Sequence, residues 1–200
     1  MTQAADTSMT QAKAPRADAV RNRKKILTAA GKQITVYGPD VGMDEMAAAA
    51  GVAVGTLYRH FPTKTDLVAA VVAEYLARVA DDAEAALARV ADGEGRALDE
   101  LTAFLGRVVE QSATDRAVKA AAQTLGAALG NRADEDRAGA AVAGLIHAGQ
   151  VDGDIRTDVT VNDIYLLFST APADLPPAAR TRWLALVTPG LTAQSRPAES

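Results

Sequence analysis

The chain contains no cysteine, so its 200 residues cannot form a disulfide or a thiolate metal site. Aromatic residues are scarce at 4%, and alanine is abundant, which favours packed helices because strands prefer aromatic and β-branched side chains. No apolar run approaches the roughly 20 residues of a membrane span. The first 20 residues lack the apolar core of a signal peptide. We therefore expect an all-α, soluble, cytoplasmic protein.

Catalytic and metal-binding patterns are missing as well. The sequence has no catalytic triad, nucleophile elbow, phosphate-binding loop or zinc spacing. The acidic run Asp134, Glu135 and Asp136 has no visible partner ligands, which favours a solvated helix start over a metal site. We expect no enzyme activity, no cofactor and no metal.

The charge is unevenly distributed along the chain. The net charge is −4, yet residues 1–64 carry nine Lys/Arg against five Asp/Glu, and residues 65–200 carry twelve against twenty. A basic N-terminal part on an acidic body orients a protein toward a polyanion, because the body repels the phosphates that the basic part attracts. The distribution therefore favours DNA as a partner in spite of the negative total.

The most informative segment is AGVAVGTLYRHFPTK, residues 50–64. Upstream of it, residues 43–50 are predicted to form a short helix, and Gly51 allows the sharp turn that follows. A second short helix carries polar and basic side chains and ends before Pro62. A helix, a glycine turn and a polar-faced second helix form the helix-turn-helix pattern, whose second helix enters the DNA major groove.

Apolar periodicity predicts about nine helices and no strand. We expect a disordered tail over residues 1–15, a helix-turn-helix DNA-binding domain over 16–64, a helical regulatory and dimerisation domain over 65–192, and a tail over 193–200. A long helix over 64–91 should bridge the two domains, with the boundary inside it. Shorter helices are predicted over 96–112, 115–129, 133–150, 160–170 and 178–187.

At the helix-turn-helix segment the chain resembles the TetR family of transcriptional regulators. The wording G-V-x-x-G-T-L-Y-R-H-F-x-x-K, from Gly51 to Lys64, is typical of that family, and the resemblance is specific over about residues 17–75. The stretch from His147 to Ile164 loosely resembles the C-terminal domain of one TetR subgroup. The resemblance implies a homodimeric, ligand-responsive repressor whose partners are a palindromic double-stranded DNA operator and a small-molecule effector.

The resemblance also implies which side chains meet DNA. Val54 and Gly55 occupy the start of the recognition helix that approaches base edges, whereas Tyr58 meets phosphate or a thymine methyl. On the first helix, cations near the N-terminus oppose the helix macrodipole, so phosphate contact explains them better than local stability. The predicted DNA-binding residues are Arg21, Lys24, Lys25, Val54, Gly55, Thr56, Tyr58, Arg59, His60 and Lys64.

Three positions depart from the family pattern. Gly42 stands where many relatives place a threonine or serine, Met43 after it also lacks a donor, and Asp44 stands where some relatives have an arginine that reads bases. Arg59 is then the best candidate for bidentate guanine contact, with a phosphate contact as the equal alternative. The departures also admit a second hypothesis, a small-molecule- or partner-binding helical protein with a vestigial DNA-binding module.

The body offers candidate residues for an effector pocket and a dimer interface. The candidate ligand-binding residues are Phe104, Gln111, Gln123, His147 and Tyr165, each with a role in the core, an interface or the surface as its ordinary alternative. The last two helices are the best source of an interface between two copies. The candidate interface residues are Ile164, Leu167, Phe168, Trp183, Leu184 and Val187, with core packing as the alternative for Trp183.

Overall fold

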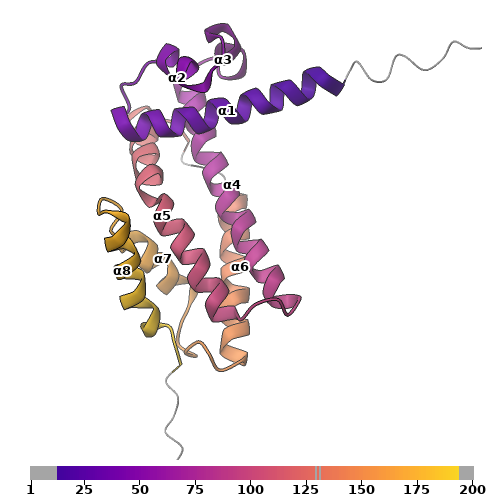
Figure 1. The fold of residues 1–200 in the computed structure, drawn as a ribbon, viewed down its shortest axis with the longest axis vertical. Helices are drawn as coiled ribbons and strands as arrows, with labels where there is room; N and C mark the ends of the chain where they lie inside the picture. Colours follow the sequence, from indigo (N-terminus) through magenta and orange to yellow (C-terminus); the bar gives the residue numbers. More distant parts are fainter. Residues whose placement is uncertain (1–12, 129, 131, 194–200) are drawn as a thin grey trace, which may run out of the picture. The chain divides into compact units, whose positions relative to one another are not determined.

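The computed structural model describes residues 13–128, 130 and 132–193, without the side chains of residues 13–16, 112, 113 and 115. This part of the chain holds eight α-helices, one short 3₁₀ helix and no strand (Figure 1). A single isolated β-bridge joins Ile155 and Thr192. The predicted all-α fold is confirmed. The helices are α1 (Lys13–Tyr37), α2 (Met43–Ala50), α3 (Val54–His60), α4 (Lys64–Ala91), α5 (Ala97–Thr124), α6 (Arg132–Val151), α7 (Val161–Thr170), α8 (Pro177–Val187) and η1 (Thr188–Gly190).

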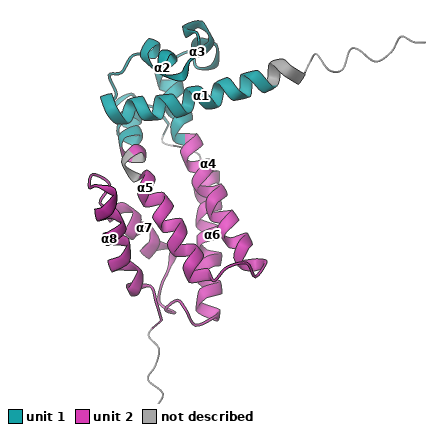
Figure 2. Cartoon of the chain, viewed as in Figure 1, with its two compact units in different colours: residues 1–72, 117–129 teal, residues 73–116, 130–200 magenta. Residues whose placement is uncertain are grey.

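The chain divides into two compact units, coloured separately in Figure 2. Unit 1 comprises residues 1–72 and 117–129, and unit 2 comprises residues 73–116 and 130–200. The division therefore passes through α4 after Val72 and through α5 after Arg116. The sequence-based domains 16–64 and 65–192 are a different partition and stay a prediction.

Unit 1 is built around the apolar face of α1. Ile26, Ala30 and Ile34 of this helix are at most 1% exposed, at the 3.6-residue spacing of a single helix face. The other fully buried side chains of unit 1 come from α2, α3, the start of α4 and the end of α5, so the short helices α2 and α3 are held by burial rather than by length. Helices of seven or eight residues are marginal in water without such packing.

Unit 2 has a core of its own, made by α4, α5, α6 and α7. Leu101, Leu105, Leu145 and Ile155 are each at most 1% exposed in this cluster. Gly149 of α6 lies against Ile155, so closely that a Cβ at this position would fall 2.5 Å from the Ile155 Cδ1 atom. The close approach explains why a glycine sits inside α6 despite its low helix propensity.

Arginine–carboxylate pairs join the helices of unit 2 at its surface. Arg137 of α6 bonds Asp134 on its own helix and Asp81 and Glu84 on α4, with nitrogen–oxygen distances of 2.6–2.9 Å. The hydrogen bonds from Arg137 hold the pKa of Glu84 below its ordinary value. The acidic run at the start of α6 therefore supplies a partner for Arg137, in keeping with the helix start expected from sequence.

Two predicted boundaries need correction. The first helix begins at Lys13, so residues 13–15 of the tail predicted over residues 1–15 are helical, whereas residues 1–12 lie outside the described part. Pro15 is tolerated there because the first turn of a helix has no internal partner for a backbone N–H.

The two helices predicted over 96–112 and 115–129 are one continuous helix, α5, over Ala97–Thr124. The polar stretch between Gln111 and Arg116 contains neither glycine nor proline, and serine or threonine inside a helix costs only a few tenths of a kcal/mol. The chain turns later, at Gly126, whose φ of 63° lies in the left-handed region.

Candidate DNA-binding interface

Helices α2 and α3 form a helix-turn-helix in unit 1. Gly51 ends α2 in the left-handed conformation with φ 65°, and its N–H donates to the Ala48 carbonyl at 3.0 Å. The Val52 N–H donates to the Ala47 carbonyl at 3.1 Å, which completes a Schellman turn. Leu57 is the buried side chain of α3, at 0% exposure. One anchor thus fixes α3 and leaves its outer surface to solvent.

The outer surface of α3 carries the side chains predicted for DNA contact. Val54 is 40% exposed and Tyr58 45% exposed, although both are apolar enough to be buried elsewhere. Gly55 and Arg59 are also exposed, whereas Thr56 and His60 are half-buried. The structure therefore places all six predicted residues of α3 in positions from which a partner can reach them.

Arg59 lies along its own helix toward the N-terminal end of α3. Its Nε donates to the Gly55 carbonyl at 3.2 Å, and one Nη nitrogen donates to the Thr56 hydroxyl at 3.3 Å. Recognition helices of this type present their N-terminal residues to base edges. The guanidinium is thus held beside the part of α3 that approaches the bases, with N–H groups to spare.

Gly55 has no role within the fold that requires a glycine. A Cβ added at this residue would meet no heavy atom of the described chain within 4 Å, and its φ is not in the left-handed region. Glycine inside a helix costs about 0.5–1 kcal/mol relative to alanine. The missing side chain therefore leaves room for something outside the chain to approach the backbone of α3.

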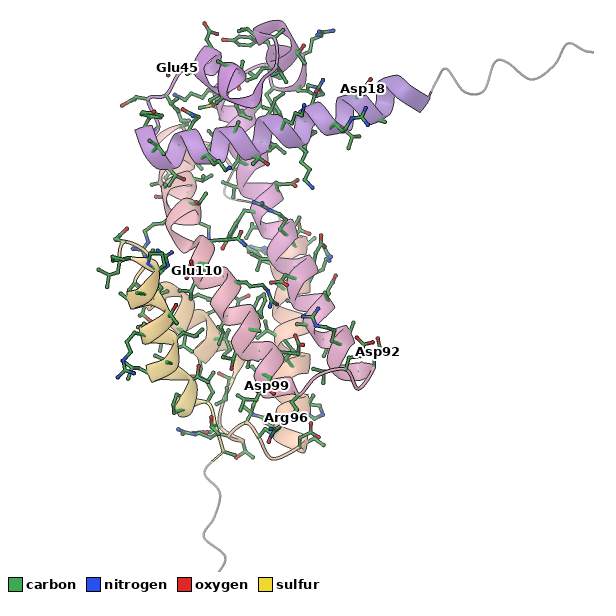
Figure 3. The ribbon with its side chains drawn as sticks, viewed as in Figure 1. Asp18, Glu45, Asp92, Arg96, Asp99 and Glu110 are labelled. Carbon is green, nitrogen blue, oxygen red and sulfur yellow. The ribbon has the colours of Figure 1, made fainter. Side chains whose placement is uncertain are left out.

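The helix starts on either side of α3 are capped by carboxylates. Glu45, labelled in Figure 3, accepts a hydrogen bond from the Gly42 N–H at 2.8 Å, which is the half of a capping box that the third helical residue supplies. Glycine has no side chain to accept a hydrogen bond from the first turn in return. At α4, Asp66 accepts from the Thr63 N–H at 3.1 Å and the Asp66 N–H donates to the Thr63 hydroxyl at 3.1 Å. This reciprocal capping box, predicted from sequence, fixes the start of α4, where Lys64 is half-buried.

The basic cluster of α1 divides into side chains with and without partners. Arg21 pairs with Asp18, three residues earlier, and Arg23 lies over the Phe61 ring at 5.5 Å from its centroid. Lys24 and Lys25 are exposed, and neither has an ion-pair partner among the described residues. Arg23 is a cation of the first helix outside the list of predicted DNA-binding residues, and its contact joins α1 to the end of α3.

The predicted ligand-binding residues do not gather at one place. Phe104 is 1% exposed in the core of unit 2, with the Phe168 ring edge-on at 6.0 Å. Gln111, His147 and Tyr165 are exposed on unit 2, whereas Gln123 is exposed on unit 1. The ligand assignments accordingly stay predictions.

Unit 2 also buries polar atoms that the sequence did not indicate. The Thr102 hydroxyl, the Nη2 of Arg107 and the Nε of Arg180 are buried without a hydrogen-bond partner among the described residues. An unsatisfied buried donor costs about 1–3 kcal/mol. No spacing in the sequence marks these atoms, because burial of a single nitrogen depends on packing between helices.

One predicted interface residue lies in the core of unit 2. Ile164 is 1% exposed in the single chain, so it offers almost no surface to a second copy. Leu167, Phe168 and Leu184 pack partly against that core, and Trp183 and Val187 are half-buried. The exposed apolar side chains on α7 and α8 are ones that the prediction left out: Tyr165 at 50%, Leu166 at 60% and Leu186 at 60%.

Comparisons with known proteins agree with this geometry. Residues 26–71 match the family described as bacterial regulatory proteins, tetR family, and residues 96–193 match the SbtR-like C-terminal domain of transcriptional regulators. The structure of a TetR transcription regulatory protein from Mycobacterium vanbaalenii is 34% identical, with 88% of this chain and 98% of that chain covered and a TM-score of 0.71. The chain belongs to the TetR family.

Other solved structures give the same result for the fold. The TetR regulator SCO0520 from Streptomyces coelicolor is 28% identical, and the match covers 86% of this chain and 99% of that chain with a TM-score of 0.72. A TetR-family protein from Mesorhizobium loti is 22% identical over 86% and 95% of the two chains, with a TM-score of 0.60. Among curated proteins none matches the chain.

Membership of the TetR family confirms the resemblance seen in sequence at both ends of the chain. TetR-family proteins are DNA-binding transcription regulators with a helix-turn-helix, not enzymes. Among the described residues, no helix combines the length and apolar character needed to cross a membrane. The same part of the chain contains no group of three or more His, Asp or Glu side chains placed to hold a metal ion.

Proposed function

We propose that this TetR-family chain is a ligand-responsive repressor that binds a palindromic operator as a homodimer in the cytoplasm. The observation that carries the proposal is the outer surface of α3. It combines an unneeded glycine at Gly55, exposed apolar side chains at Val54 and Tyr58, and an arginine held toward the helix start. A surface with these features suits the close approach of a duplex. It has no explanation in a protein whose DNA-binding module is vestigial.

Each predicted residue has a distinct task in this proposal. Val54, Gly55 and Arg59 face the base edges. Tyr58, Thr56 and His60 position the phosphate backbone, as do Lys64 at the start of α4 and Arg21, Lys24 and Lys25 on α1. Phosphate contacts fix the register of the protein on the duplex, whereas base contacts select the sequence.

Replacing Lys64 by alanine tests the DNA-binding function directly. Binding should weaken on all duplex sequences alike, and the slope of log affinity against log salt should flatten by about 0.9 for each lost phosphate contact, or roughly two for a dimer. The fold should be unaffected, since a cation at the start of α4 opposes the helix macrodipole. The measurement is a salt titration of binding to random duplex and to inverted repeats taken from the DNA beside the coding sequence.

Arg78→Ala is the matched control for this experiment. Arg78 is an exposed cation of the same helix, fourteen residues and about 21 Å further along it. Its removal should leave both affinity and slope unchanged. If the wild-type chain bound no duplex in a salt-dependent way, the vestigial-module hypothesis would replace the repressor.

The proposed dimer uses the exposed apolar side chains of α7 and α8. Two copies that bury Tyr165, Leu166 and Leu186 would form a self-complementary patch, as two-fold symmetry requires. The predicted interface residues Leu167, Phe168, Trp183, Leu184 and Val187 would then lie beneath or beside this patch.

We expect Leu186→Asp to raise the dissociation constant of the dimer at least tenfold, or about 1.4 kcal/mol, because the interface would bury an unpaired carboxylate. Sedimentation at micromolar concentration should show the wild-type chain as a dimer and the variant shifted toward monomer. Val151→Asp is the control, since Val151 is 72% exposed at the end of α6 and is not part of the proposed patch. A wild-type monomer that binds an inverted repeat tightly would contradict the dimer.

The proposed effector acts by shifting a conformational equilibrium. It would bind unit 2, where Gln111 and His147 are exposed and Phe104 lies in the core, while Gln123 belongs to unit 1. Tyr165, the fifth candidate ligand-binding residue, would be shared with the proposed dimer interface. An effector changes operator affinity only by its differential affinity for the two conformations, and a 100-fold preference corresponds to about 2.7 kcal/mol.

A further inference from the structure

Unit 1 contains a groove that the residues assigned above do not fully account for. It lies between α1 and the C-terminal end of α2, and has a volume of about 550 Å³. Four cationic side chains line it, Arg21, Lys24, Lys25 and Lys32, and no carboxylate does. Ala49 and Ala50 form the wall on the α2 side. An open groove with these walls suits an anion rather than an apolar ligand.

The cationic side chains lie in a straight row along α1 and not around a single point. Arg21, Lys25, Thr28 and Lys32 follow one another at intervals of four, three and four residues, which places them on one face of α1. At 1.5 Å per residue the row is about 16 Å long. A single phosphate or a small carboxylate would reach only one or two of these side chains, whereas a polymer with regularly repeated charges can engage all of them.

The stability of the chain does not explain this row of cations. Lys25 and Lys32 are exposed and have no ion-pair partner among the described residues. Arg21 and Lys25 are four residues apart on a helix, a spacing at which like charges repel. An arrangement that disfavours the isolated helix is best explained by a partner of opposite charge.

The position of the groove identifies the partner. The first helix of a helix-turn-helix crosses the DNA backbone when the second enters the major groove. Here that first helix is α2, and its last residues, Ala49 and Ala50, form the wall of the groove. Because both side chains are small, the backbone of a DNA strand has room to lie close to α1.

We propose that this groove is a second track for the sugar–phosphate backbone of the operator duplex, with Lys32 and Thr28 as contacts at its inner end. The inference rests on the DNA-binding function proposed above. It extends the contact surface on α1 beyond Arg21, Lys24 and Lys25, to Thr28 and Lys32. Nothing in the sequence pattern of the helix-turn-helix itself points to Lys32.

The test compares Lys32→Ala, Lys32→Arg and Lys64→Ala with the wild-type chain on the same inverted-repeat duplex. Lys32→Ala should flatten the salt slope by about 0.9 per subunit, and Lys32→Arg should restore it. In ethylation interference, the alanine variant should become insensitive to a set of phosphates different from the set lost with Lys64→Ala. Lys32 is exposed and alanine favours helix, so circular dichroism and thermal unfolding should show an intact fold.

The outcomes separate this inference from the function on which it rests. If Lys64→Ala flattens the slope and Lys32→Ala matches the wild-type slope and interference pattern, the groove is not a DNA track, although the repressor stands. If inorganic pyrophosphate raises the melting temperature of the wild-type chain but not of Lys32→Ala, while DNA binding is unchanged, the groove takes a small anion and the proposal is overturned. If the wild-type chain binds no duplex, both proposals fail together.

Discussion

Leu57→Ala is expected to lower the free energy of unfolding of unit 1 by about 2–5 kcal/mol and to abolish tight operator binding. Leu57 is 0% exposed and is the buried anchor of α3, a helix of seven residues. Truncation of a buried leucine removes its transfer free energy and leaves a cavity. Because so short a helix depends on burial, α3 should lose its fixed orientation before the rest of the chain unfolds.

Val54→Ala on the same helix is the control for Leu57→Ala. Val54 is 40% exposed, so its truncation should change stability by no more than about 0.5 kcal/mol. Thermal unfolding and hydrogen exchange of the α3 amides measure the two effects separately. Equal exchange rates and melting temperatures in the two variants would show that α3 is held by something other than Leu57.

Arg59→Ala is expected to remove selection for a guanine in each half of the operator. A good bidentate pair between arginine and guanine is worth about 1–3 kcal/mol of discrimination, and a dimer would lose it twice. The hydrogen bonds from Arg59 to Gly55 and Thr56 are exposed, so the fold should lose little stability with them. Selection from a randomised operator library, read out by sequencing, measures the effect position by position.

Arg59→Lys distinguishes the two interpretations of Arg59. Lysine keeps the charge but lacks the planar fork, so it should restore overall affinity without restoring the preference for guanine. A uniform loss of affinity for Arg59→Ala across the whole library would assign Arg59 to phosphate. Operator selection would then depend on the shape and deformability of the duplex.

The helix-turn-helix was predictable because its determinants are local. Gly51, Leu57 and the Thr63–Asp66 capping box act within a few residues of one another, and each does in the structure what its spacing indicates. The predicted break in α5 is wrong because the residues between Gln111 and Arg116 are weak helix formers and not helix breakers. The helix ends at Thr124, shortly before Gly126 in the left-handed conformation.

The surface and pocket residues of unit 2 were less predictable because they depend on packing between distant segments. Ile164, Leu167 and Phe168 share an apolar character in sequence, yet only the packed core shows that Ile164 is buried and that Leu166 is exposed. The basic groove of unit 1 also depends on packing. The helical period of α1 places its cations on one face, but the alanine wall comes from α2 and forms only when the two helices pack together.

At Gly55, the residue that is best for the stability of α3 differs from the residue that is best for DNA binding. A Cβ at this position would meet no heavy atom of the described chain within 4 Å, and alanine there would strengthen α3. Engineering or laboratory evolution guided by heat resistance alone would therefore replace the glycine at this position and yield a more stable protein that binds DNA poorly. A screen for hardier versions of this regulator needs a promoter readout beside the thermal one.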